Sequence, residues 1–516
     1  MIYPVGVQSF EKLRREGCVY VDKTMYVWKL ARQVSPIFLS RPRRFGKSLL
    51  LSTLEAYFSG KKELFEGLAI YGLEKEWNQY PVFHFDFNSV KTDTTTGLDE
   101  LIDWQLSRYE KIWDVVCADK WNFPIRLSNL LIAARDKTSR ECVILVDEYN
   151  KMLLNSESDK LLQDKYKTTL KPFYGVIKSM DSYIKFSMIT GVGRYGKVSI
   201  FSDLNNLRDI SLDAEFSAIC GISDAEVEEY FSSSIKDYAR ANDLGIGETK
   251  KLLRNHYDGY CFSKPKISEK VYNPFSLMSA FVSNSSEDYW FETGTPTFVI
   301  DDLIAGNFRF SELNDLDATR SELLGVNEVG RSPVTTLFQT GYLTIKSYYP
   351  DTNTYRLGFP NMEVEKAFDT FSLKVINSEG NAPFSIDKIR ADILNGKPED
   401  FMIRLRSFFK DFPYGQIPSL ELHYNNVLYL VFKLLGYYTH TERQTSDGCI
   451  DMLVETRKYI YLFEFKLNLN ADKALAQIEN KEYAIPYQVD GRKVFKIGVN
   501  FSSKSRGISD WKIETD

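Results

Sequence analysis

The sequence predicts an α/β protein with a helix-covered parallel sheet in its first half, a helical middle module and a second α/β domain at its C-terminal end. Three short apolar runs support this prediction, at residues 36–40, 143–146 and 459–463. Each run suits a strand that is buried on both faces, and each leads into polar residues at its carboxyl end. At 516 residues the chain is also too long for one ordinary core, so several domains are expected.

The composition is that of a globular protein with ample apolar material, with 43% hydrophobic and 26% charged residues. Lys and Arg number 65 against 70 Asp and Glu, which gives a formal net charge of −5. A protein that coats nucleic acid along its whole surface would carry a basic excess, so this class is excluded. A local basic groove is compatible with the balance.

Cysteine usage and hydropathy point to a reducing compartment away from membranes. Six cysteines are scattered without a C-x-x-C pair, namely Cys18, Cys117, Cys142, Cys220, Cys261 and Cys449. Buried reduced thiols are therefore expected rather than a zinc cluster or a disulfide framework. The N-terminal residues lack the pattern of a signal peptide. The longest apolar run, residues 427–438, is broken by Lys433 and is shorter than the ~20 residues that cross a bilayer. We expect a cytoplasmic protein with no membrane partner.

The first strand is followed by a phosphate-binding pattern. Residues 41–48 read RPRRFGKS and lead into a helical stretch, LLLSTLEAYF, which is the strand, loop and helix layout of a P-loop. Gly46 lets backbone N–H groups approach a phosphate, Lys47 places a cation at the β- and γ-phosphates, and the Ser48 hydroxyl can ligate Mg²⁺. Arg41 stands where the first glycine of the usual pattern falls. Taken alone, the Gly-Lys-Ser tripeptide fits an ordinary helix start equally well.

Further strands supply the partners that a P-loop needs. Asp147 and Glu148 follow the strand at 143–146; in P-loop enzymes the first acid holds the Mg²⁺ shell and the second can polarise the attacking water. Additional strands are expected at residues 81–89 and 184–189, and the latter leads into Thr190, where such folds place a sensor of the γ-phosphate. These features predict ATP and Mg²⁺ as cofactors, with Glu148 catalytic and with Ser48 and Asp147 as metal ligands. We expect the nucleotide to be bound by Arg44, Phe45, Gly46, Lys47, Ser48, Asp147 and Thr190.

Two groups of residues in this half leave alternatives open. The basic cluster of Arg41, Arg43 and Arg44 could contact the nucleotide or could pair with nearby acids. His84 lies in the strand expected at 81–89, and we interpret it as a packed core residue rather than a ligand.

The middle of the chain, residues 222–384, has the pattern of a helical lid or winged-helix-like module. Ser223 and Glu226 are spaced as a capping box at the start of a helix, and residues 336–345 and 355–359 are expected to form a small strand pair. Several aromatic residues could stack on bases, although a core between domains is the favoured interpretation. They are Tyr257, Tyr260, Phe262, Tyr289, Trp290 and Phe291. A helical segment at 385–411 and a loop at 411–418 lead to the last domain.

The last hundred residues contain a pattern of carboxylates around a lysine. Asp451 is followed thirteen residues later by Glu464-x-Lys466, the spacing of a D…E-x-K nuclease core. Residues two apart in a strand share a face, so Glu464 and Lys466 point to the same side and Asp451 can meet them from the adjacent strand. Two carboxylates at one site favour a divalent cation, and Lys466 would then orient or deprotonate water. The alternative is an amphipathic strand with a solvated cation.

Other residues complete this pattern. Glu421 could add a carboxylate from the first helix of the domain, and Gln477 and Lys481 lie one turn apart on a later helix. His423 and His440 are expected to be structural.

Taken together, the segments RPRRFGKS, VDEYNKMLL, IFSDLNNL and YDGYCFS, with their surroundings, resemble a bacterial AAA-ATPase-like family. In this family a P-loop domain precedes a PD-(D/E)XK-type nuclease domain, and the resemblance covers nearly the whole chain. It implies a P-loop without the first glycine, and it places Glu421, Asp451, Glu464, Lys466 and Gln477 on the nuclease motif. The sequence departs from the family pattern at Asn150, Met152 and Cys449, where Asp, Pro and Arg are common.

The expected architecture has three parts: a P-loop NTPase domain at 1–221, a helical or winged-helix-like module at 222–384, and linker helices with a restriction-endonuclease-like domain at 385–516. The leading hypothesis is an ATP-regulated enzyme that cleaves nucleic acid with Mg²⁺, and the resemblance implies DNA rather than RNA. One alternative is an ATP-dependent switch whose nuclease-like domain binds nucleic acid or a partner without cutting, which Cys449 favours. Another is an oligomeric signalling ATPase, for which Arg194 is a candidate finger acting in the neighbouring subunit.

Overall fold

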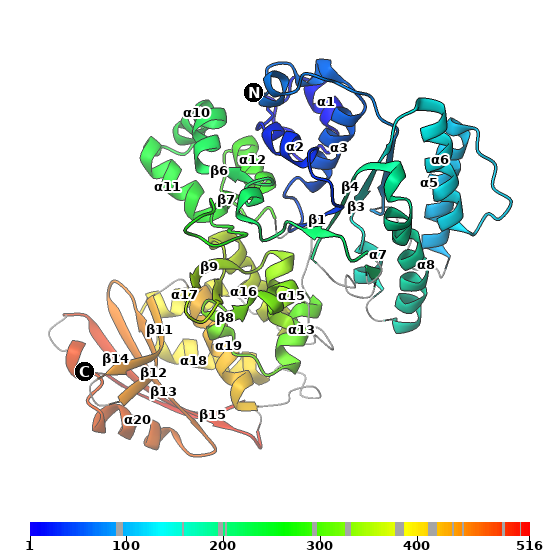
Figure 1. The fold of residues 1–516 in the computed structure, drawn as a ribbon. Coiled ribbons are helices and arrows are strands. Elements are labelled where there is room, and N and C mark those ends of the chain that lie inside the picture. The colour runs from blue at the N-terminus through cyan, green and yellow to red at the C-terminus, as the bar shows by residue number, and fades with distance from the viewer. Residues whose placement is uncertain are drawn as a thin grey trace. The chain divides into compact units, whose positions relative to one another are not determined.

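In the computed structural model the chain folds into two compact units (Figure 1). Each unit is made of two separate stretches of the sequence. Unit 1 consists of Met1–Thr293 and Leu316–Val364, and unit 2 of Gly294–Asp315 and Glu365–Asp516. The structure describes residues 1–88, 96–156, 159–193, 200–201, 204–290, 297–325, 332–376, 386–410, 420–435, 438–445, 448–487, 491–505 and 507–515.

Unit 1 is built on a five-stranded parallel sheet in the order β2-β3-β4-β1-β5. Its strands are β1 (Ile37–Ser40), β2 (Val82–Asp86), β3 (Cys142–Asp147), β4 (Ile184–Gly191) and β5 (Arg208–Asp209). Strands β1 and β3 are buried along their whole length, as their unbroken apolar sequences predict for a sheet covered on both faces. The carboxyl ends of β1, β3 and β4 therefore meet at one edge of the sheet, where the predicted nucleotide residues lie.

Helices cover both faces of this sheet. Phe83 and Phe85 of β2 face a core that also contains side chains of α5, α6 and α8, whereas His84 faces Glu55 of α3, because neighbouring strand residues point to opposite faces. His84 is partly buried and bonded to Glu55, which fits its interpretation as a packed residue. The helical segments of this part are α1 (Phe10–Arg15), α2 (Thr24–Leu30), α3 (Lys47–Phe58), η1 (Lys62–Phe65), α4 (Ala69–Leu73), α5 (Gly97–Trp113), α6 (Phe123–Thr138), α7 (Lys151–Asn155), α8 (Lys160–Ser179), η2 (Asp181–Tyr183) and η3 (Ala214–Phe216).

The remainder of unit 1 is mainly helical and takes up part of the module expected at 222–384, because residues 294–315 and those from 365 onward belong to unit 2. The Ser223–Glu226 capping box is formed at the start of α10. The helices are α10 (Asp224–Ala241), α11 (Ile246–Tyr257), α12 (Pro274–Ser283), α14 (Arg320–Leu324) and α15 (Pro333–Thr340). The strands are β6 (Ile222–Ser223) and β7 (Val271–Tyr272), which pair with each other, and β8 (Leu316–Thr319), β9 (Thr344–Tyr349) and β10 (Thr354–Gly358), which form a sheet in the order β8-β10-β9.

One prediction in this module is wrong. Residues 336–340 belong to helix α15 and not to the first strand of a pair, which begins at Thr344. Three residues override the strand-like composition: the Ser332 side chain caps the helix, Pro333 occupies its first turn, and Gly341 ends it with a φ of 95°. The segment therefore supplies a helix and then a strand.

Unit 2 contains a mixed five-stranded sheet in the order β11-β12-β13-β14-β15. Its strands are β11 (Tyr438–Thr445), β12 (Gly448–Glu455), β13 (Tyr459–Leu467), β14 (Lys493–Ser502) and β15 (Gly507–Thr515). Only β13 and β14 run parallel; the other neighbours are antiparallel. The register pairs Met452 with Phe463, so Asp451 and Glu464 come at the next step along the two strands.

Helices pack on both faces of the second sheet. Leu462 belongs to a core with Leu475 and Ile478 of α20, whereas the ring of its neighbour Phe463 contacts the rings of Phe401 in α18 and Phe432 in α19. The helical segments are α13 (Thr297–Ala305), η5 (Phe310–Glu312), α16 (Met362–Ile376), α17 (Ile386–Leu394), α18 (Pro398–Lys410), α19 (Leu420–Leu434), α20 (Ala471–Asn480) and η7 (Ile485–Tyr487). The boundary between the two units falls within α16.

The predicted fold class is confirmed: an α/β protein with a P-loop-type parallel sheet, a helical middle module and a mixed α/β domain at the C-terminal end. The predicted helical linker at 385–411 consists of α17 and α18, and the loop at 411–418 lies outside the described residues. Among the helices that the structure describes, none is long and apolar enough to cross a membrane.

Candidate nucleotide and nuclease sites

The phosphate loop lies between β1 and α3. Gly46 stands at the N-cap of α3 with a φ of 94°, a left-handed conformation that suits glycine. Lys47 follows in the first turn and is only 4% exposed; its Nζ donates to the carbonyl oxygens of Arg41 at 3.1 Å and Pro42 at 3.2 Å. The lysine side chain is thus folded back over the loop, where a bound phosphate would lie.

The predicted acids meet the loop at the carboxyl edge of the sheet. Ser48 Oγ donates to Asp147 Oδ2 at 2.5 Å, and Thr190 Oγ1 donates to Asp147 Oδ1 at 2.7 Å. Lys47 Nζ lies 3.0 Å from Glu148 Oε1. Burial, together with the charge of Glu148, raises the pKa of Asp147 above its usual range. The sequence-predicted Lys47, Ser48, Asp147, Glu148 and Thr190 are therefore brought together.

This arrangement fits a magnesium ion in its donor chemistry. The hydroxyl of Ser48 and the carboxylate of Asp147 are oxygen donors, which Mg²⁺ prefers, and they already lie within hydrogen-bonding distance of each other. Asp147 is 3% exposed, so a cation beside it would also offset the cost of burying its negative charge.

Arg41, which replaces the first glycine of the usual P-loop, anchors the loop to backbone. Its guanidinium is 1% exposed and donates to the carbonyl oxygens of Ser211 at 2.8 Å and Phe216 at 2.9 Å. It also lies 4.2 Å from the ring centroid of Phe262. The sequence leaves two interpretations open for the basic cluster: contact with nucleotide, or pairing with acids. The bonds of Arg41 to carbonyl groups agree with neither of them.

The middle module packs aromatic rings against the loop. The ring of Phe45 makes edge contacts with Tyr260 and Phe262, at centroid distances of 4.7 Å and 5.5 Å. Trp290 Nε1 donates to the carbonyl oxygen of Arg43 at 3.1 Å. Tyr260, Phe262 and Trp290 are thus buried core residues, as the favoured interpretation of the aromatic residues held, and Phe291 lies outside the described residues.

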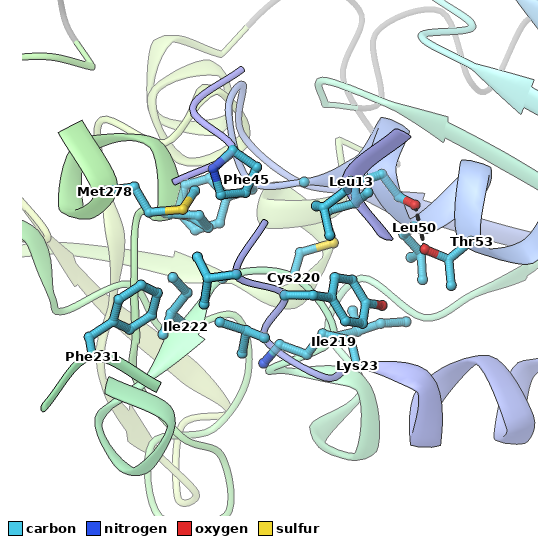
Figure 2. A pocket seen from close by; sticks show the side chains of 18 residues that line it. Leu13, Lys23, Phe45, Leu50, Thr53, Ile219, Cys220, Ile222, Phe231 and Met278 are labelled. Carbon is cyan, nitrogen blue, oxygen red and sulfur yellow. Dashed lines mark hydrogen bonds between the residues drawn. The ribbon is translucent and has the colours of Figure 1, made fainter. Parts of the chain in front are cut away.

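An apolar cavity of about 90 Å³ lies beside the loop (Figure 2). It is lined by Phe45, Gly46 and Leu50 from the loop and α3, by residues of the N-terminal segment such as Leu13 and Lys23, by Ile219, Cys220 and Ile222, and by Phe231 and Met278 of the middle module. Five separate stretches of sequence meet here, so no local motif could have indicated the cavity.

The second site lies where β12 and β13 run side by side. Asp451 Oδ2 accepts a hydrogen bond from the backbone N–H of Phe465 at 2.8 Å, which places its carboxylate between Glu464 and Lys466. Lys466 Nζ donates to Glu464 Oε1 at 2.7 Å. This geometry agrees with the expectation that Glu464 and Lys466 share a face of the strand and meet Asp451.

Glu464 is the unusual member of the group. It is only 1% exposed, and burial together with the negative charge of Asp451 raises its pKa to about 7. Within the described residues, Glu464 Oε2 has no hydrogen-bond partner. A buried carboxylate oxygen without a partner is costly, and a divalent cation is a group that would satisfy it. The residues present therefore fit a hard metal ion.

A cavity of about 570 Å³ opens beside Asp451 and Lys466, and the buried Glu464 is not among its lining residues. Asp451, Met452, Phe465, Lys466 and Leu467 line one side of it from β12 and β13, and α19 adds Tyr424, Asn425, Asn426, Leu428 and Tyr429. The remaining lining residues are Phe501 of β14 and, from the chain just before β8, Arg309, Ser311, Glu312 and Asp315. Sequence reasoning missed this last segment, because it is more than a hundred residues from the motif.

Other predicted site residues are less closely placed. Glu421 lies in the first turn of α19, the helix that lines the cavity, but its side chain and that of Cys449 are outside the described residues. Gln477 lies on a half-buried position of α20 and is not among the residues that line the cavity. Among the described side chains, no three His, Cys, Asp or Glu residues form a ready metal cluster. The roles of Glu421 and Gln477 stay predictions.

A glycine holds α20 close to the strands of this site. Gly498 of β14 lies beside Glu464 in register, and a Cβ atom there would come within 2.5 Å of the carbonyl oxygen of Ala471. Only glycine allows the helix to approach the sheet this closely.

The departures from the family pattern in the first half are accommodated in the core. Asn150 is fully buried and its Nδ2 donates to the carbonyl oxygen of Val192 at 3.2 Å, a bond that an ionised aspartate could not donate. Met152 is fully buried in the core under the sheet. Arg194 lies outside the described residues.

Comparison with known proteins finds a family match in each half of the chain. Residues 4–201 match the family described as "Predicted AAA-ATPase", and residues 419–511 match the PD-(D/E)XK nuclease superfamily. An uncharacterized protein from the vnfD 5′ region of Azotobacter chroococcum mcd 1 is 33% identical over 524 residues, which cover 99% of this chain and 98% of that protein. The chain belongs to this bacterial AAA-ATPase-like family.

A further similarity is found among solved structures. The ORC2 protein of Aeropyrum pernix, in its ADPNP-ADP complexes, is 13% identical to this chain, with a TM-score of 0.23. The match covers 72% of this chain and 93% of the ORC2 chain. A TM-score this low carries no argument about the AAA-ATPase-like chain. The assignment rests on the two family matches and on the full-length relative.

Proposed function

We propose that this AAA-ATPase-like protein binds and hydrolyses ATP and couples it to Mg²⁺-dependent phosphodiester cleavage of nucleic acid, with DNA as the substrate. The observation that supports the nuclease most is Glu464: a buried carboxylate with one unpartnered oxygen, next to Asp451 and bonded to Lys466. A structural strand would not normally bury such a charge without a compensating group.

In the proposed cleavage, Asp451 and Glu464 would hold the cation, and Glu421 of α19 would add a further carboxylate. When bound, the cation would stabilise the charge that develops on the scissile phosphate. Lys466 binds and orients the attacking water and offsets the phosphate charge. The water oxygen forms the new P–O bond while the bond to the leaving sugar oxygen breaks. The attacking water gives one proton to solvent, and the leaving sugar oxygen takes one proton from solvent.

In the proposed ATPase reaction, the phosphates compete with Glu148 for Lys47. The 3.0 Å contact between Lys47 and Glu148 would be replaced by contacts from Lys47 to the β- and γ-phosphates, which leaves the Glu148 carboxylate free to polarise water. Asp147 and Ser48 would hold Mg²⁺, and Thr190 would sense the γ-phosphate through Asp147. The apolar cavity beside Gly46 would take the adenine ring (Figure 2).

A second candidate function is an ATP-dependent switch that binds nucleic acid without cutting it. Cys449 favours this candidate, because it stands where the family often has an arginine two residues before the site aspartate. The two candidates differ only in whether a phosphodiester bond is broken. A cytoplasmic location and assembly of several copies are part of both proposals.

The test compares metal-dependent cleavage by the wild type and by two lysine variants, one in β13 and one just before it. Plasmid DNA, single-stranded DNA and RNA are incubated with Mg²⁺ or Mn²⁺ and ATP. Lys466→Ala should lower the cleavage rate by about 10²- to 10⁴-fold, the range expected for loss of a group that positions or deprotonates water. Lys458→Ala, an exposed lysine near the start of the same strand, is the matched control and should cut like the wild type.

Absence of cleavage by folded, ATP-binding wild type on all three substrates would reject the nuclease and favour the binding switch. Equal cleavage by wild type and Lys466→Ala would reject this site as the source of the activity.

A further inference from the structure

The nuclease cavity has a second wall that comes from a distant part of the chain. Residues 308–315, here called the wall segment, precede β8 and contain the short helix η5. Arg309, Ser311, Glu312 and Asp315 of this segment line the cavity together with Asp451 and Lys466. The wall segment therefore supplies part of the cavity lining from outside residues 419–511, which match the nuclease superfamily.

Asn426 of α19 fastens the wall segment by its backbone. Its Oδ1 accepts a hydrogen bond from the N–H of Phe310 at 3.0 Å, and its Nδ2 donates to the carbonyl oxygen of Phe308 at 2.9 Å. Asn426 is 7% exposed, so these bonds are shielded from water. An asparagine side chain is suited to this role because it offers both a donor and an acceptor.

Further contacts hold the wall segment at both ends. The Phe310 ring is 1% exposed and lies 6.3 Å from the ring of Phe368 in α16. Asn314 Nδ2 donates to Glu365 Oε1 at 2.7 Å, and Glu365 in turn lies 2.9 Å from Lys433 Nζ of α19. A segment fixed at three points is a built part of the cavity and does not swing freely.

We propose that the wall segment makes the nuclease site a single-strand site, one that accepts a single nucleic acid strand and excludes an intact duplex. This inference rests on the proposed nuclease function. A cavity of 570 Å³ is in the size range of pockets that enclose one small-molecule ligand, so it has room for part of one strand but not for two paired strands. A duplex could reach Asp451 and Lys466 only if the wall segment moved away.

The chemistry of the lining supports the same assignment. Lys466 and Arg309 both line the cavity and supply cations that can contact the backbone of one strand. Tyr429 offers a ring on which an unpaired base can stack. Glu312 and Asp315 add carboxylates to the wall segment, and these repel the phosphates of a second strand.

The experiment measures strand selectivity by binding, so that it does not depend on cutting. A fluorescein-labelled single-stranded DNA of about 20 nucleotides and the matching duplex are titrated with the full chain in Ca²⁺, and anisotropy gives the two values of Kd. The wild type should bind the single strand at least about tenfold more tightly than the duplex, since stacking of even one base is worth that much. The same preference should appear in Mg²⁺-dependent cleavage.

Asn426→Ala removes both bonds to the wall segment and should lower the ratio of duplex Kd to single-strand Kd severalfold by admitting duplex. Asn314→Ala, at the other end of the wall segment, should also lower this ratio. If Asn426→Ala does not fold, the ratio for Asn314→Ala tests the inference. Asn480→Ala, an exposed asparagine at the end of α20, is the matched control and should keep the wild-type ratio.

Equal affinity of the wild type for single strand and duplex would overturn the inference, as would a ratio that is unchanged in both wall variants. If Lys466-dependent cleavage then persists on both substrates, only the inference fails and the proposed function stands. If neither ligand binds and neither is cut, the proposed function and the inference fail together.

Discussion

Glu363 is a buried carboxyl group in the first turn of α16. Its Oε1 accepts hydrogen bonds from the backbone N–H of Trp290 at 2.8 Å and from Ser276 Oγ at 3.0 Å. Burial raises its pKa from 4.5 to about 8. At neutral pH the group is therefore protonated in the folded protein, next to the tryptophan that bonds to the phosphate loop.

This pKa predicts how stability depends on pH. Because the folded pKa lies above the unfolded one, the stability from Glu363 is fully present below pH 4.5 and is lost as pH rises through about 8. Each increase of one pH unit between these two pKa values lowers the free energy of unfolding by up to about 1.4 kcal/mol. Glu363→Gln keeps the acceptor oxygen but does not titrate, so its free energy of unfolding should fall less between pH 5 and 8 and should exceed that of the wild type at pH 9.

Urea unfolding of the full chain at pH 5, 7 and 9 measures this difference. Glu63→Gln, at an exposed glutamate, is the control and should follow the wild type at every pH. Parallel stability curves for Glu363→Gln and the wild type would show that Glu363 titrates normally.

Single residues were predictable from the sequence where a motif fixes their chemistry. Lys47, Ser48, Asp147 and Thr190 lie together as expected, because the carboxyl ends of parallel strands meet at one edge. The role of Arg41 was not predictable, since it bonds to backbone carbonyls about 170 residues away and no side-chain pattern records such a bond.

At the scale of elements, α16 and α19 are joined by a partly buried charge cluster, in which Asp369 is the buried member. Lys433 of α19 lies 2.9 Å from Glu365 and 3.0 Å from Asp369 of α16. Burial raises the pKa of Asp369 to about 7 even though Lys433 opposes this shift. The two carboxylates raise the pKa of Lys433 although burial acts in the opposite direction, so the lysine stays charged.

Lys433→Met should destabilise the chain by about 3 kcal/mol, because it leaves the buried Asp369 carboxylate without its cation. Lys433→Met combined with Asp369→Leu should recover most of this loss, since an apolar pair can replace a buried ion pair at little cost. Thermal unfolding of the full chain measures both changes. Lys473→Met, on the exposed side of α20, should leave the Tm unchanged. A double variant no more stable than Lys433→Met would contradict this account of the cluster.

Elements were predictable where periodicity and end signals agree. The buried strands β1, β3 and β13 and the cap of α10 lie where the sequence places them. Residues 336–340 have a strand-like composition but form the end of α15, because Ser332, Pro333 and Gly341 fix a helix there. The capping residues therefore determine that this segment is helical, although its composition favours a strand.

For the whole molecule, the sequence indicated two chemistries and the family but not the shape of either site. The cavity beside Gly46 and the wall segment are each assembled from stretches far apart in sequence, and only tertiary packing brings them together. The net charge of −5 excluded a wholly basic surface and agrees with a local site of mixed charge. The boundaries at 221/222 and 384/385 stay predictions.

The central claim is that ATP at the first site controls cleavage at the second, and one rate measurement tests it most directly. Cleavage of single-stranded DNA in Mg²⁺ is followed for the wild type with and without ATP, and for Lys47→Ala under both conditions. The account predicts that ATP changes the wild-type rate by about 5- to 150-fold, the usual range of coupling between two sites, and that Lys47→Ala does not respond. Equal wild-type rates with and without ATP, in protein that binds the nucleotide, would contradict the claim.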